Sequence, residues 1–342
     1  MGNNRINLLY IEESGVSGEE YLSFLVKHYG NRAIQKYTKR FDWYKKQKDY
    51  RVLLAINNKT IVGQSCAFKN TAIIQNKETE IWWGVDVFVL PEARGKGIGK
   101  LMQKKLHVDL QNFCSAWYSP INGIVKRKCG SKELFSLSFS YYPVSSFFSY
   151  IISLVIKKIF KKQLTFNLSV PFIYTSLNKK RRLQSYVFDD IELDRDDVYE
   201  FIGNSTINKS DFYIKRDREY LKWRYLENPN LKYHIIEILY KGKREAILIF
   251  THIHKQDGLY VTKFMDAFKV NVSNLTEKDY HILIAEYFKR RNQSLDGILS
   301  LFDLNYFPKV IRRSFFLSNM QLDTPIKSPY ISYSDQDMVQ MY

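Results

Sequence analysis

From residue 85 to residue 102 the chain reads Val85-Asp86-Val87-Phe88-Val89-Leu90-Pro91-Glu92-Ala93-Arg94-Gly95-Lys96-Gly97-Ile98-Gly99-Lys100-Leu101-Met102. The apolar residues up to Leu90 predict a buried strand, which Pro91 ends because proline has no backbone N–H to donate. Three glycines free the next turn of side chains, and an amphipathic helix is expected from Ile98 to about Asn112. The N–H groups at such a helix start have no partner within the helix, so they can hold a phosphate group, with Arg94 and two lysines adding positive charge.

The segments around this turn predict a mixed sheet. Most neighbouring strands are expected to be antiparallel, because short polar turns separate them. The expected elements are strands at 7–11, 51–57, 60–68, 72–75, 80–90 and 114–118, and helices at 17–27 and 98–112. The first part of the chain is therefore predicted to be an α/β (α+β) domain with a strand–turn–helix unit near the centre of its sheet.

The same order of elements recurs in the second half of the chain, which predicts an internal repeat. The second copy is expected to contain a hairpin at 233–240 and 246–252, a strand at 259–265, a helix at 277–291 and a strand at 297–302. Its turn, residues 266–274, has neither glycine nor arginine, so it cannot easily present successive N–H groups to a phosphate. We therefore predict two tandem mixed, mostly antiparallel sheets flanked by helices, and a phosphate site in the first copy alone.

Four segments follow from this division of the chain. The predicted boundaries are residues 1–142 for the first domain, 143–185 for a basic and apolar linker helix region, 186–330 for the second domain and 331–342 for a tail. A chain of 342 residues is of the usual length for two domains.

Composition excludes several classes of protein. Hydrophobic residues make up 45% of the chain and aromatic residues 15%, so the bulk of it has the material for buried cores. Three cysteines without a CxxC pair exclude a secreted disulfide scaffold. Glu12 and Glu13 stand before any apolar stretch of signal-peptide length, and the run 144–156 falls short of the roughly 20 residues that a spanning helix needs. A cytoplasmic protein is expected.

The net charge of +17 is unevenly distributed. Between residues 122 and 182 there are twelve Lys or Arg and one acid, Glu133. Such a segment suggests an anionic partner, whereas the plain alternative is a solvated basic face. Residues 145–162 combine a short apolar helical face with clustered lysines, as in an interfacial helix. One hypothesis is therefore peripheral contact with the inner face of the membrane, and the alternative is a linker helix packed between the two copies.

The turn quoted first also has a family resemblance. A phosphate loop of the form GxxxxGK[ST] and a dinucleotide fingerprint GxGxxG do not fit it. The spacing RxxGxG, formed by Arg94, Gly97 and Gly99 after Val89-x-Pro91, closely resembles the acyl-coenzyme-A signature of the GNAT acyltransferase superfamily. The resemblance implies acetyl-CoA or another acyl-CoA as co-substrate and no metal, and His252-x-His254, the one pair of histidines with metal-like spacing, has no apparent third ligand.

The resemblance also implies which residues hold the coenzyme. Phe88, Val89 and Leu90 would pair their backbone with the pantetheine arm, and Asn122 stands where the family commonly has an Asn. The pyrophosphate cradle would be formed by Arg94, Gly95, Lys96, Gly97, Ile98, Gly99 and Lys100.

The catalytic groups are less clear from the sequence. Acyl transfer needs a base for the proton of the acceptor, and Asp86 and Glu80, on the strand that leads to the cradle, are candidates. The family's usual acid is a Tyr where this chain has Cys129-Gly130-Ser131, so Tyr118 is the candidate in its place, with Tyr141 and Tyr142 as alternatives.

Three functions compete at this stage. The first is an acyl-CoA-dependent N- or O-acetyltransferase acting on a small-molecule or glycan acceptor such as a sugar of a surface polysaccharide, because residues 216–229 resemble a stretch in GNAT-like proteins of bacterial surface-polysaccharide clusters. The second is a Fem-like transferase that uses aminoacyl-tRNA, against which the intact RxxGxG argues. The third is a non-catalytic basic module that binds nucleic acid or membrane.

Overall fold

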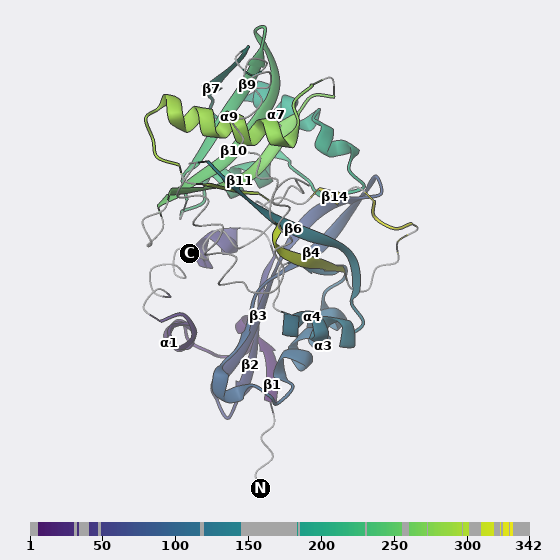
Figure 1. Cartoon of the computed structure of the whole chain (residues 1–342). Coiled ribbons are helices and arrows are strands. Elements are labelled where there is room, and N and C mark those ends of the chain that lie inside the picture. The colour runs from purple at the N-terminus through teal and green to yellow at the C-terminus, as the bar shows by residue number, and fades with distance from the viewer. Residues whose placement is uncertain are drawn as a thin grey trace. The chain divides into compact units, whose positions relative to one another are not determined.

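The computed structural model of the chain divides into two compact units, drawn in Figure 1. The first unit takes residues within 1–136, 227–230 and 314–328, and the second takes residues within 137–226, 231–313 and 329–342. The residues that the structure describes are 6–30, 33, 41–46, 49–116, 120–144, 183, 185–229, 231–254, 260–271, 273–295, 297–300, 309–317, 322, 324–327 and 329–330.

The first unit contains a mixed sheet in the order β1-β2-β3-β4-β5-β13. Its neighbouring strands are antiparallel except for β4 and β5, which are parallel. The elements are β1 (Ile6–Tyr10), η1 (Ile11–Glu13), α1 (Gly18–Tyr29), β2 (Tyr50–Asn57), β3 (Thr60–Ile74), β4 (Lys77–Val89), η2 (Pro91–Ala93), α3 (Ile98–Asp109), β5 (Phe113–Ala116), α4 (Pro120–Lys128) and β13 (Lys309–Leu317), of which residues 314–317 belong to this unit.

One expectation for this unit is wrong. The strands predicted at 60–68 and 72–75 are a single strand of 15 residues, β3, which pairs with β2 at one end and with β4 along its length. The polar residues between them do not break the ladder, because Lys69 pairs with Trp82 in register and its ammonium lies 2.7 Å from the Glu80 carboxylate.

The two helices α1 and α3 pack on opposite faces of this sheet. Successive side chains of a strand point to opposite faces, so Leu53 contributes to the core under α3 while its neighbour Leu54 faces the other way. Helix α1 begins at a capping box formed by Ser17 and Glu20, and its aromatic residues contact Phe88 of β4. The end of β4 is therefore held against α1.

A β-bulge interrupts β4 just before this end. Gln64 pairs with Phe88 and Cys66 with Val85, so two residues of β4 oppose one of β3. Asp86, in the bulge, has φ +47°. Among the described residues, parallel pairing joins β4 to β5 only at Trp82 and Trp83, ahead of the bulge. Because a bulge bends its strand, β4 changes direction after Val85.

The second unit repeats this plan, as the sequence predicts. Its sheet has the order β6-β12-β11-β10-β9-β7, with β11 and β12 parallel and the other neighbours antiparallel. The elements are β7 (Tyr186–Asp190), α7 (Asp196–Gly203), η3 (Thr206–Lys209), β8 (Phe212–Ile214), α8 (Arg218–Leu221), a π-helical turn η4 (Lys222–Leu226), β9 (Tyr233–Tyr240), β10 (Lys243–His254), β11 (Tyr260–Lys269), α9 (Glu277–Arg290), β12 (Gly297–Ser300) and β14 (Pro329–Tyr330), and β6 (Lys132–Pro143) reaches this unit from the first. Helix α9 lies across the sheet in Figure 1 and packs Leu283, Ile284 and Phe288 into its core. The fold class of two mixed, mostly antiparallel sheets flanked by helices is confirmed.

Most of the predicted linker helix, residues 145–182, lies outside the described residues. In the part of the chain that the structure describes, no helix is both long enough and apolar enough to cross a membrane.

Candidate functional site

The turn between β4 and α3 is built as the sequence predicts. After η2, Gly95 and Gly97 have φ values of +80° and +74°, which L side chains rarely adopt. Gly97 is the N-cap of α3 and has no side chain to accept a hydrogen bond from the first N–H groups of the helix. The first N–H that returns to the turn is that of Leu101, which donates to the Gly97 carbonyl (3.1 Å). The helix start is therefore left to an external acceptor.

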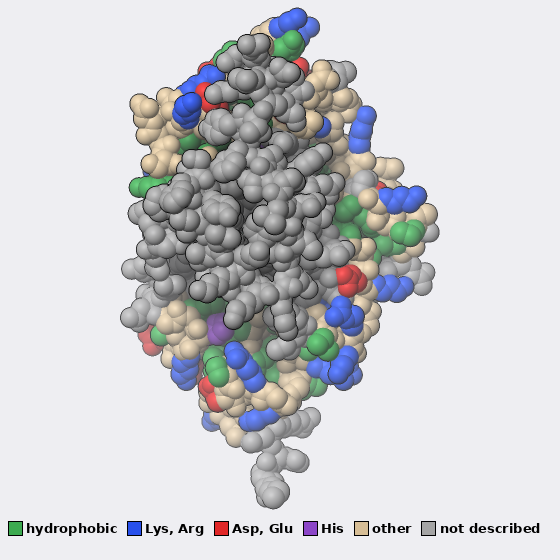
Figure 2. Space-filling model, viewed as in Figure 1, with side chains coloured by type: hydrophobic (Ala, Val, Ile, Leu, Met, Phe, Trp, Pro, Cys, Tyr) green, Lys and Arg blue, Asp and Glu red, His purple; other side chains and the backbone are tan. Residues whose placement is uncertain are grey.

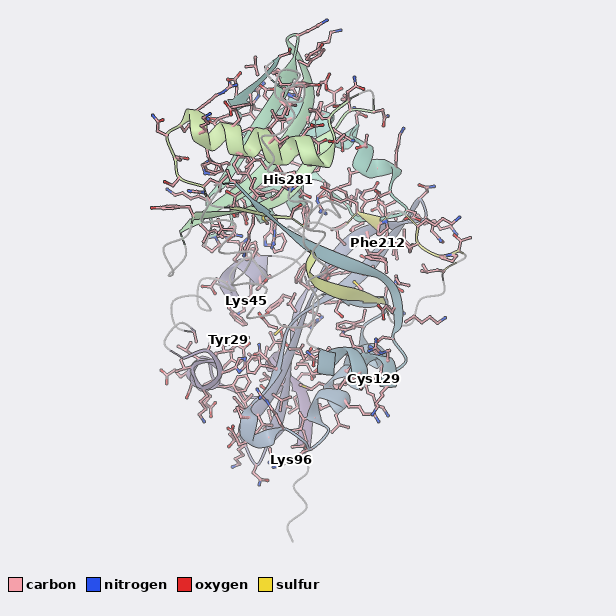
Figure 3. The ribbon with its side chains drawn as sticks, viewed as in Figure 1. Tyr29, Lys45, Lys96, Cys129, Phe212 and His281 are labelled. Atoms are coloured by element: carbon pink, nitrogen blue, oxygen red, sulfur yellow. The ribbon has the colours of Figure 1, made fainter. Side chains whose placement is uncertain are left out.

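The space in front of this helix start is open. A Cβ built on Gly95, Gly97 or Gly99 meets nothing within 4 Å. Lys96, labelled in Figure 3, and Lys100 are exposed beside it, and blue Lys and Arg side chains gather over this end of the first unit in Figure 2. A phosphate fits such a turn, because it can approach the backbone closely and meets the positive end of the helix dipole.

The end of β4 directs backbone groups away from β3. The N–H of Leu90 donates to the Val62 carbonyl (2.9 Å), and Val89 stands opposite Gly63 in the register. Hydrogen bonds alternate along an antiparallel ladder, so the N–H and C=O of Val89 point away from β3. Arg94 donates from Nε to that carbonyl (3.1 Å). This contact leaves the exposed fork of the guanidinium for a ligand at the turn.

His28, at the end of α1, lies beside this strand end. Its imidazole stacks on the ring of Phe88, with 3.8 Å between centroids and 7° between planes. Tyr29 meets the same Phe88 ring edge-on at 5.2 Å. Phe88 itself is buried, so the ring of Phe88 fixes the imidazole against β4.

Electrostatics keep His28 neutral. Burial lowers its pKa, the positive charge of Arg94 lowers it further, and the negative charge of Asp86 opposes them. The charges of Arg94 and Asp86 therefore act on the pKa of His28 in opposite directions. A neutral imidazole at pH 7 can accept a proton.

A buried pair of side chains supports the bulge. Gln64, almost fully buried, donates from Nε2 to the backbone carbonyl of Asp86 (3.2 Å) and accepts from the Tyr21 hydroxyl (2.8 Å). The pair joins α1 to the left-handed residue of β4, and so it holds His28 and Asp86 in one place.

Glu80, another predicted catalytic residue, is not brought to this point. Glu80 pairs with Lys69 and stands six residues before Asp86, which along an extended strand is about 20 Å. Tyr118 lies outside the described residues. Asn122 is the third residue of α4 and is half-buried.

A buried polar cluster ties α4 to α3 behind the turn. The Cys129 thiol, at the end of α4 (Figure 3), donates to the Lys100 carbonyl at 3.8 Å, and its own carbonyl lies 3.2 Å from His107 Nδ1. Burial and the nearby charge of Lys126 lower the pKa of His107 from the usual 6.5 to about 4. Burial also lowers the pKa of Lys126 to about 8, and it raises the pKa of Cys129. Cys129 is therefore a protonated thiol with a structural contact.

The second unit fills the corresponding place with its own side chains. A bulge interrupts β11 between Phe264 and Asp266, and the Asp266 carboxylate is fully buried. It accepts hydrogen bonds from Arg216 Nε (3.1 Å), the Tyr225 hydroxyl and the Tyr330 hydroxyl (3.0 Å). The Tyr330 hydroxyl also accepts from the Ala267 N–H (3.1 Å). The Val89 N–H points away from β3 in the first unit, whereas in the second unit the Ala267 N–H is bound by the Tyr330 hydroxyl.

Comparisons with known proteins agree with this geometry. Residues 19–113 match the sequence profile of the Acetyltransferase (GNAT) family. No curated protein matches the chain.

Solved structures share its fold. A GCN5-related N-acetyltransferase from Anabaena variabilis is 15% identical with a TM-score of 0.55, and the match covers 92% of this chain and 72% of that one. A tandem GNAT protein from the clavulanic acid biosynthesis pathway is 8% identical with a TM-score of 0.55, covering 92% and 98%. N-myristoyltransferase of Saccharomyces cerevisiae with bound myristoyl-CoA is 11% identical with a TM-score of 0.57, covering 95% and 85%. At these identities the similarity shows the fold, which is that of tandem GNAT proteins.

Sequence reasoning missed His28. In the sequence it is one of six histidines and stands on an amphipathic helix far from the glycine turn. Its place beside Phe88 follows from the packing of α1 on the sheet, and no local motif announces it. No group of three or more His, Cys, Asp or Glu side chains able to hold a metal ion occurs among the residues with a described position.

Proposed function

We propose that the first unit transfers an acetyl or other acyl group from acyl-CoA to an amino or hydroxyl group of an acceptor. The observation that carries this proposal is the uncapped, glycine-lined start of α3, placed directly after a strand whose last residue turns its backbone outward. The GNAT profile across residues 19–113 supports it.

The residues of the chain have distinct parts in this proposal. The turn from Arg94 to Lys100 would hold the pyrophosphate, and Val89, within the segment Phe88–Leu90, would meet the pantetheine arm. When bound, acyl-CoA supplies a thioester, an acyl donor whose leaving group is a thiolate. Asn122, on α4, keeps the coenzyme-binding part that the family resemblance implies.

We place the base at His28, with Asp86 beside it. The acceptor's N–H or O–H proton passes to the neutral imidazole as the acceptor bonds to the acyl carbon. The same proton then neutralises the leaving thiolate. The negative charge of Asp86 stabilises the imidazolium in between. Glu80 is about 20 Å along the strand from this point, so we do not assign it this part.

Calorimetric titration with acetyl-CoA and with coenzyme A tests the cradle. Gly97→Val puts a branched side chain into the open space in front of the helix, so affinity should fall by at least tenfold. Gly242→Val is the matched control, because Gly242 has nearly the same φ (+76° against +74°) and equally open surroundings, but lies in a hairpin turn of the second unit. Arg94→Ala removes one charge-assisted contact, so it should weaken binding by about 1.5–3 kcal/mol and by less than Gly97→Val does. The proposal would be refuted if Gly97→Val and Arg94→Ala both bound coenzyme A with the affinity of the wild type.

The pH profile of acyl transfer tests the base. The rate should fall at acid pH as His28 is protonated, with a midpoint below the usual histidine value of 6.5, because its pKa is lowered. His28→Asn should remove this limb and lower kcat by the 10²–10⁴-fold that general bases contribute. Asp86→Asn should instead move the midpoint further down, since Asp86 raises the pKa of His28. A His28→Asn variant with wild-type kcat and profile would show that the base lies elsewhere.

We propose a sugar of a surface polysaccharide or of its precursor as the acceptor. This choice is supported by the resemblance of residues 216–229 to GNAT-like proteins of surface-polysaccharide clusters. Turnover of acetyl-CoA against nucleotide-activated amino sugars, polyamines and peptides, with mass spectrometry of the products, decides both the acceptor and whether the acyl group goes to nitrogen or oxygen. Transfer to polyamines or peptides alone would refute the sugar.

A further inference from the structure

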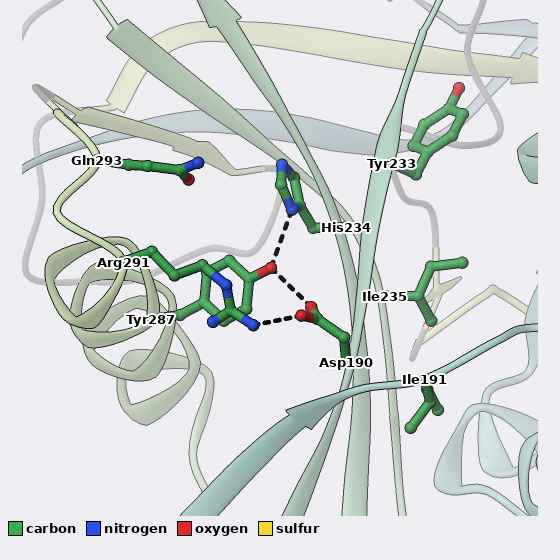
Figure 4. A pocket seen from close by; sticks show the side chains of 8 residues that line it. All are labelled: Asp190, Ile191, Tyr233, His234, Ile235, Tyr287, Arg291 and Gln293. Atoms are coloured by element: carbon green, nitrogen blue, oxygen red, sulfur yellow. Dashed lines mark hydrogen bonds and ion pairs between the residues drawn. The ribbon is translucent and has the colours of Figure 1, made fainter.

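The second unit has a pocket of about 380 Å³ with a hydrogen-bonded relay on its wall (Figure 4). The pocket lies where β7 ends beside β9, near the last turn of α9. Its lining residues are Asp190, Ile191, Tyr233, His234, Ile235, Tyr287, Arg291 and Gln293. Every one of them belongs to the second unit.

The relay runs from a carboxylate to an imidazole. The Tyr287 hydroxyl donates to Asp190 Oδ1 (2.7 Å), and His234 Nδ1 lies 3.0 Å from the same hydroxyl. Arg291 forms an ion pair with the other oxygen of Asp190 and lies over the Tyr287 ring, 3.8 Å from its centroid. Because a phenol has one hydrogen, which is used on Asp190, the contact to His234 must be a donation from Nδ1–H.

This hydrogen bond determines which nitrogen of His234 can accept a hydrogen bond from a ligand. With Nδ1 protonated, a neutral His234 presents the lone pair of Nε2. Burial lowers its pKa, the negative charge of Asp190 opposes this, and the positive charge of Arg291 lowers the pKa again. The net shift is downward, so the neutral form holds at pH 7. Figure 4 shows this nitrogen directed away from Tyr287, on the side where the Gln293 amide lies. No residue with a described position hydrogen-bonds to Nε2, and Gln293 is exposed.

The first unit provides an internal comparison. Tyr10 and Asp190 are equivalent, since each ends the first strand of its sheet, opposite Leu53 and Ile236 respectively. The Tyr10 hydroxyl donates to Asp109 of α3 (2.8 Å), the same strand-to-helix link with donor and acceptor exchanged.

By the same register, Arg51 stands where the second unit has His234. A Tyr–Asp pair therefore suffices to join strand and helix. The histidine with a nitrogen facing a pocket is an addition that the link does not require.

We propose that this pocket binds a neutral, hydroxyl-bearing molecule of about monosaccharide size, with a ligand hydroxyl donating to His234 Nε2. Asp190 and Arg291 already neutralise each other, so neither an anion nor a cation finds an uncompensated partner. A hydroxyl both donates and accepts, which suits Nε2 on one side and the Gln293 amide on the other. The volume lies within the usual range for small-molecule pockets. The proposal is independent of the coenzyme site.

The test is NMR of the full chain labelled at histidine Cε1, with the His234 resonance identified from its absence in His234→Phe. D-glucose and N-acetylglucosamine probe a free sugar, and a linear oligosaccharide of each probes the end of a glycan. Inorganic phosphate and spermidine are the charged controls. We expect a saturable shift of the His234 resonance with at least one neutral sugar and none with the controls. If the oligosaccharide binds at least tenfold tighter than its monosaccharide, the source is a glycan.

Two variants separate ligand binding from a structural link. Gln293→Ala removes an exposed side chain outside the relay, so it should leave the free energy of unfolding unchanged and raise the Kd of the sugar at least threefold. Tyr287→Phe removes the hydroxyl that orients His234 and should raise the Kd at least tenfold. A resonance that no sugar shifts, a shift with phosphate or spermidine instead, or an unchanged Kd in both variants would overturn the proposal.

Discussion

Replacing Gly99 by alanine should stabilise the first unit and at the same time weaken its binding of coenzyme A. Gly99 is the second residue of α3, its φ lies in the ordinary range, and a Cβ there meets nothing within 4 Å. Alanine therefore costs no strain and restricts the unfolded chain, which is worth about 0.5–1 kcal/mol in a helix. The new methyl group, however, occupies the space through which a phosphate would approach the N–H groups.

The size of the binding effect follows from the contacts that are lost. A hydrogen bond from a backbone N–H to a charged group is worth about 1.5–3 kcal/mol, so displacing the phosphate from one such donor should raise the Kd for coenzyme A by roughly 10- to 100-fold. Urea unfolding measures the first effect, and calorimetric titration with coenzyme A measures the second.

Gly203→Ala is the matched control for this prediction. Gly203 is the last residue of α7 in the second unit, also helical and also open to a Cβ. It should tolerate alanine without loss of stability and leave the Kd for coenzyme A unchanged. An unchanged Kd in Gly99→Ala would refute the assignment of the helix start as the phosphate site, whatever happens to stability.

Three further predictions concern the supports of the two sites. The pKa of His107 is about 4 in the folded chain and 6.5 in its usual state. As pH falls between these values, the unfolded chain binds a proton that the folded chain does not, so the free energy of unfolding of the first unit should fall by roughly 3 kcal/mol. In urea unfolding at pH 7 and pH 4.5, the difference in this free energy should be smaller for His107→Gln than for the wild type. Gln64→Leu leaves the Tyr21 hydroxyl and the carbonyl at the bulge without their partner and should cost about 1–3 kcal/mol of unfolding free energy, whereas acyl transfer at the wild-type rate in that variant would show that the bulge needs no such support. Asp266→Asn breaks a buried ion pair and should destabilise the second unit by about 3–5 kcal/mol without changing coenzyme A affinity in calorimetry, and a loss of affinity would place coenzyme in the second unit.

Much of the fold was predictable because its signals are local. Alternating apolar residues, polar turns and amphipathic helices predict the order of elements in both copies, and the prediction of α9 at 277–291 differs by one residue from Glu277–Arg290. The glycine turn was predictable for the same reason, since φ values of +80° and +74° at Gly95 and Gly97 depend on the residues themselves. The error at β3 has the opposite origin, because Lys69 is kept in the ladder by a partner on another strand.

The candidate catalytic group and the second pocket depend on contacts between distant segments. The sequence by itself determined two α/β copies and one glycine-lined helix start, because backbone freedom and hydrophobic period are properties of neighbouring residues. Only the tertiary structure placed His28 on Phe88, 60 positions later in the chain, and joined Asp190, His234 and Tyr287 in one relay. Burial, the charges that shift a pKa and the tautomer of a histidine all come from residues that the fold brings together, and no local pattern encodes them.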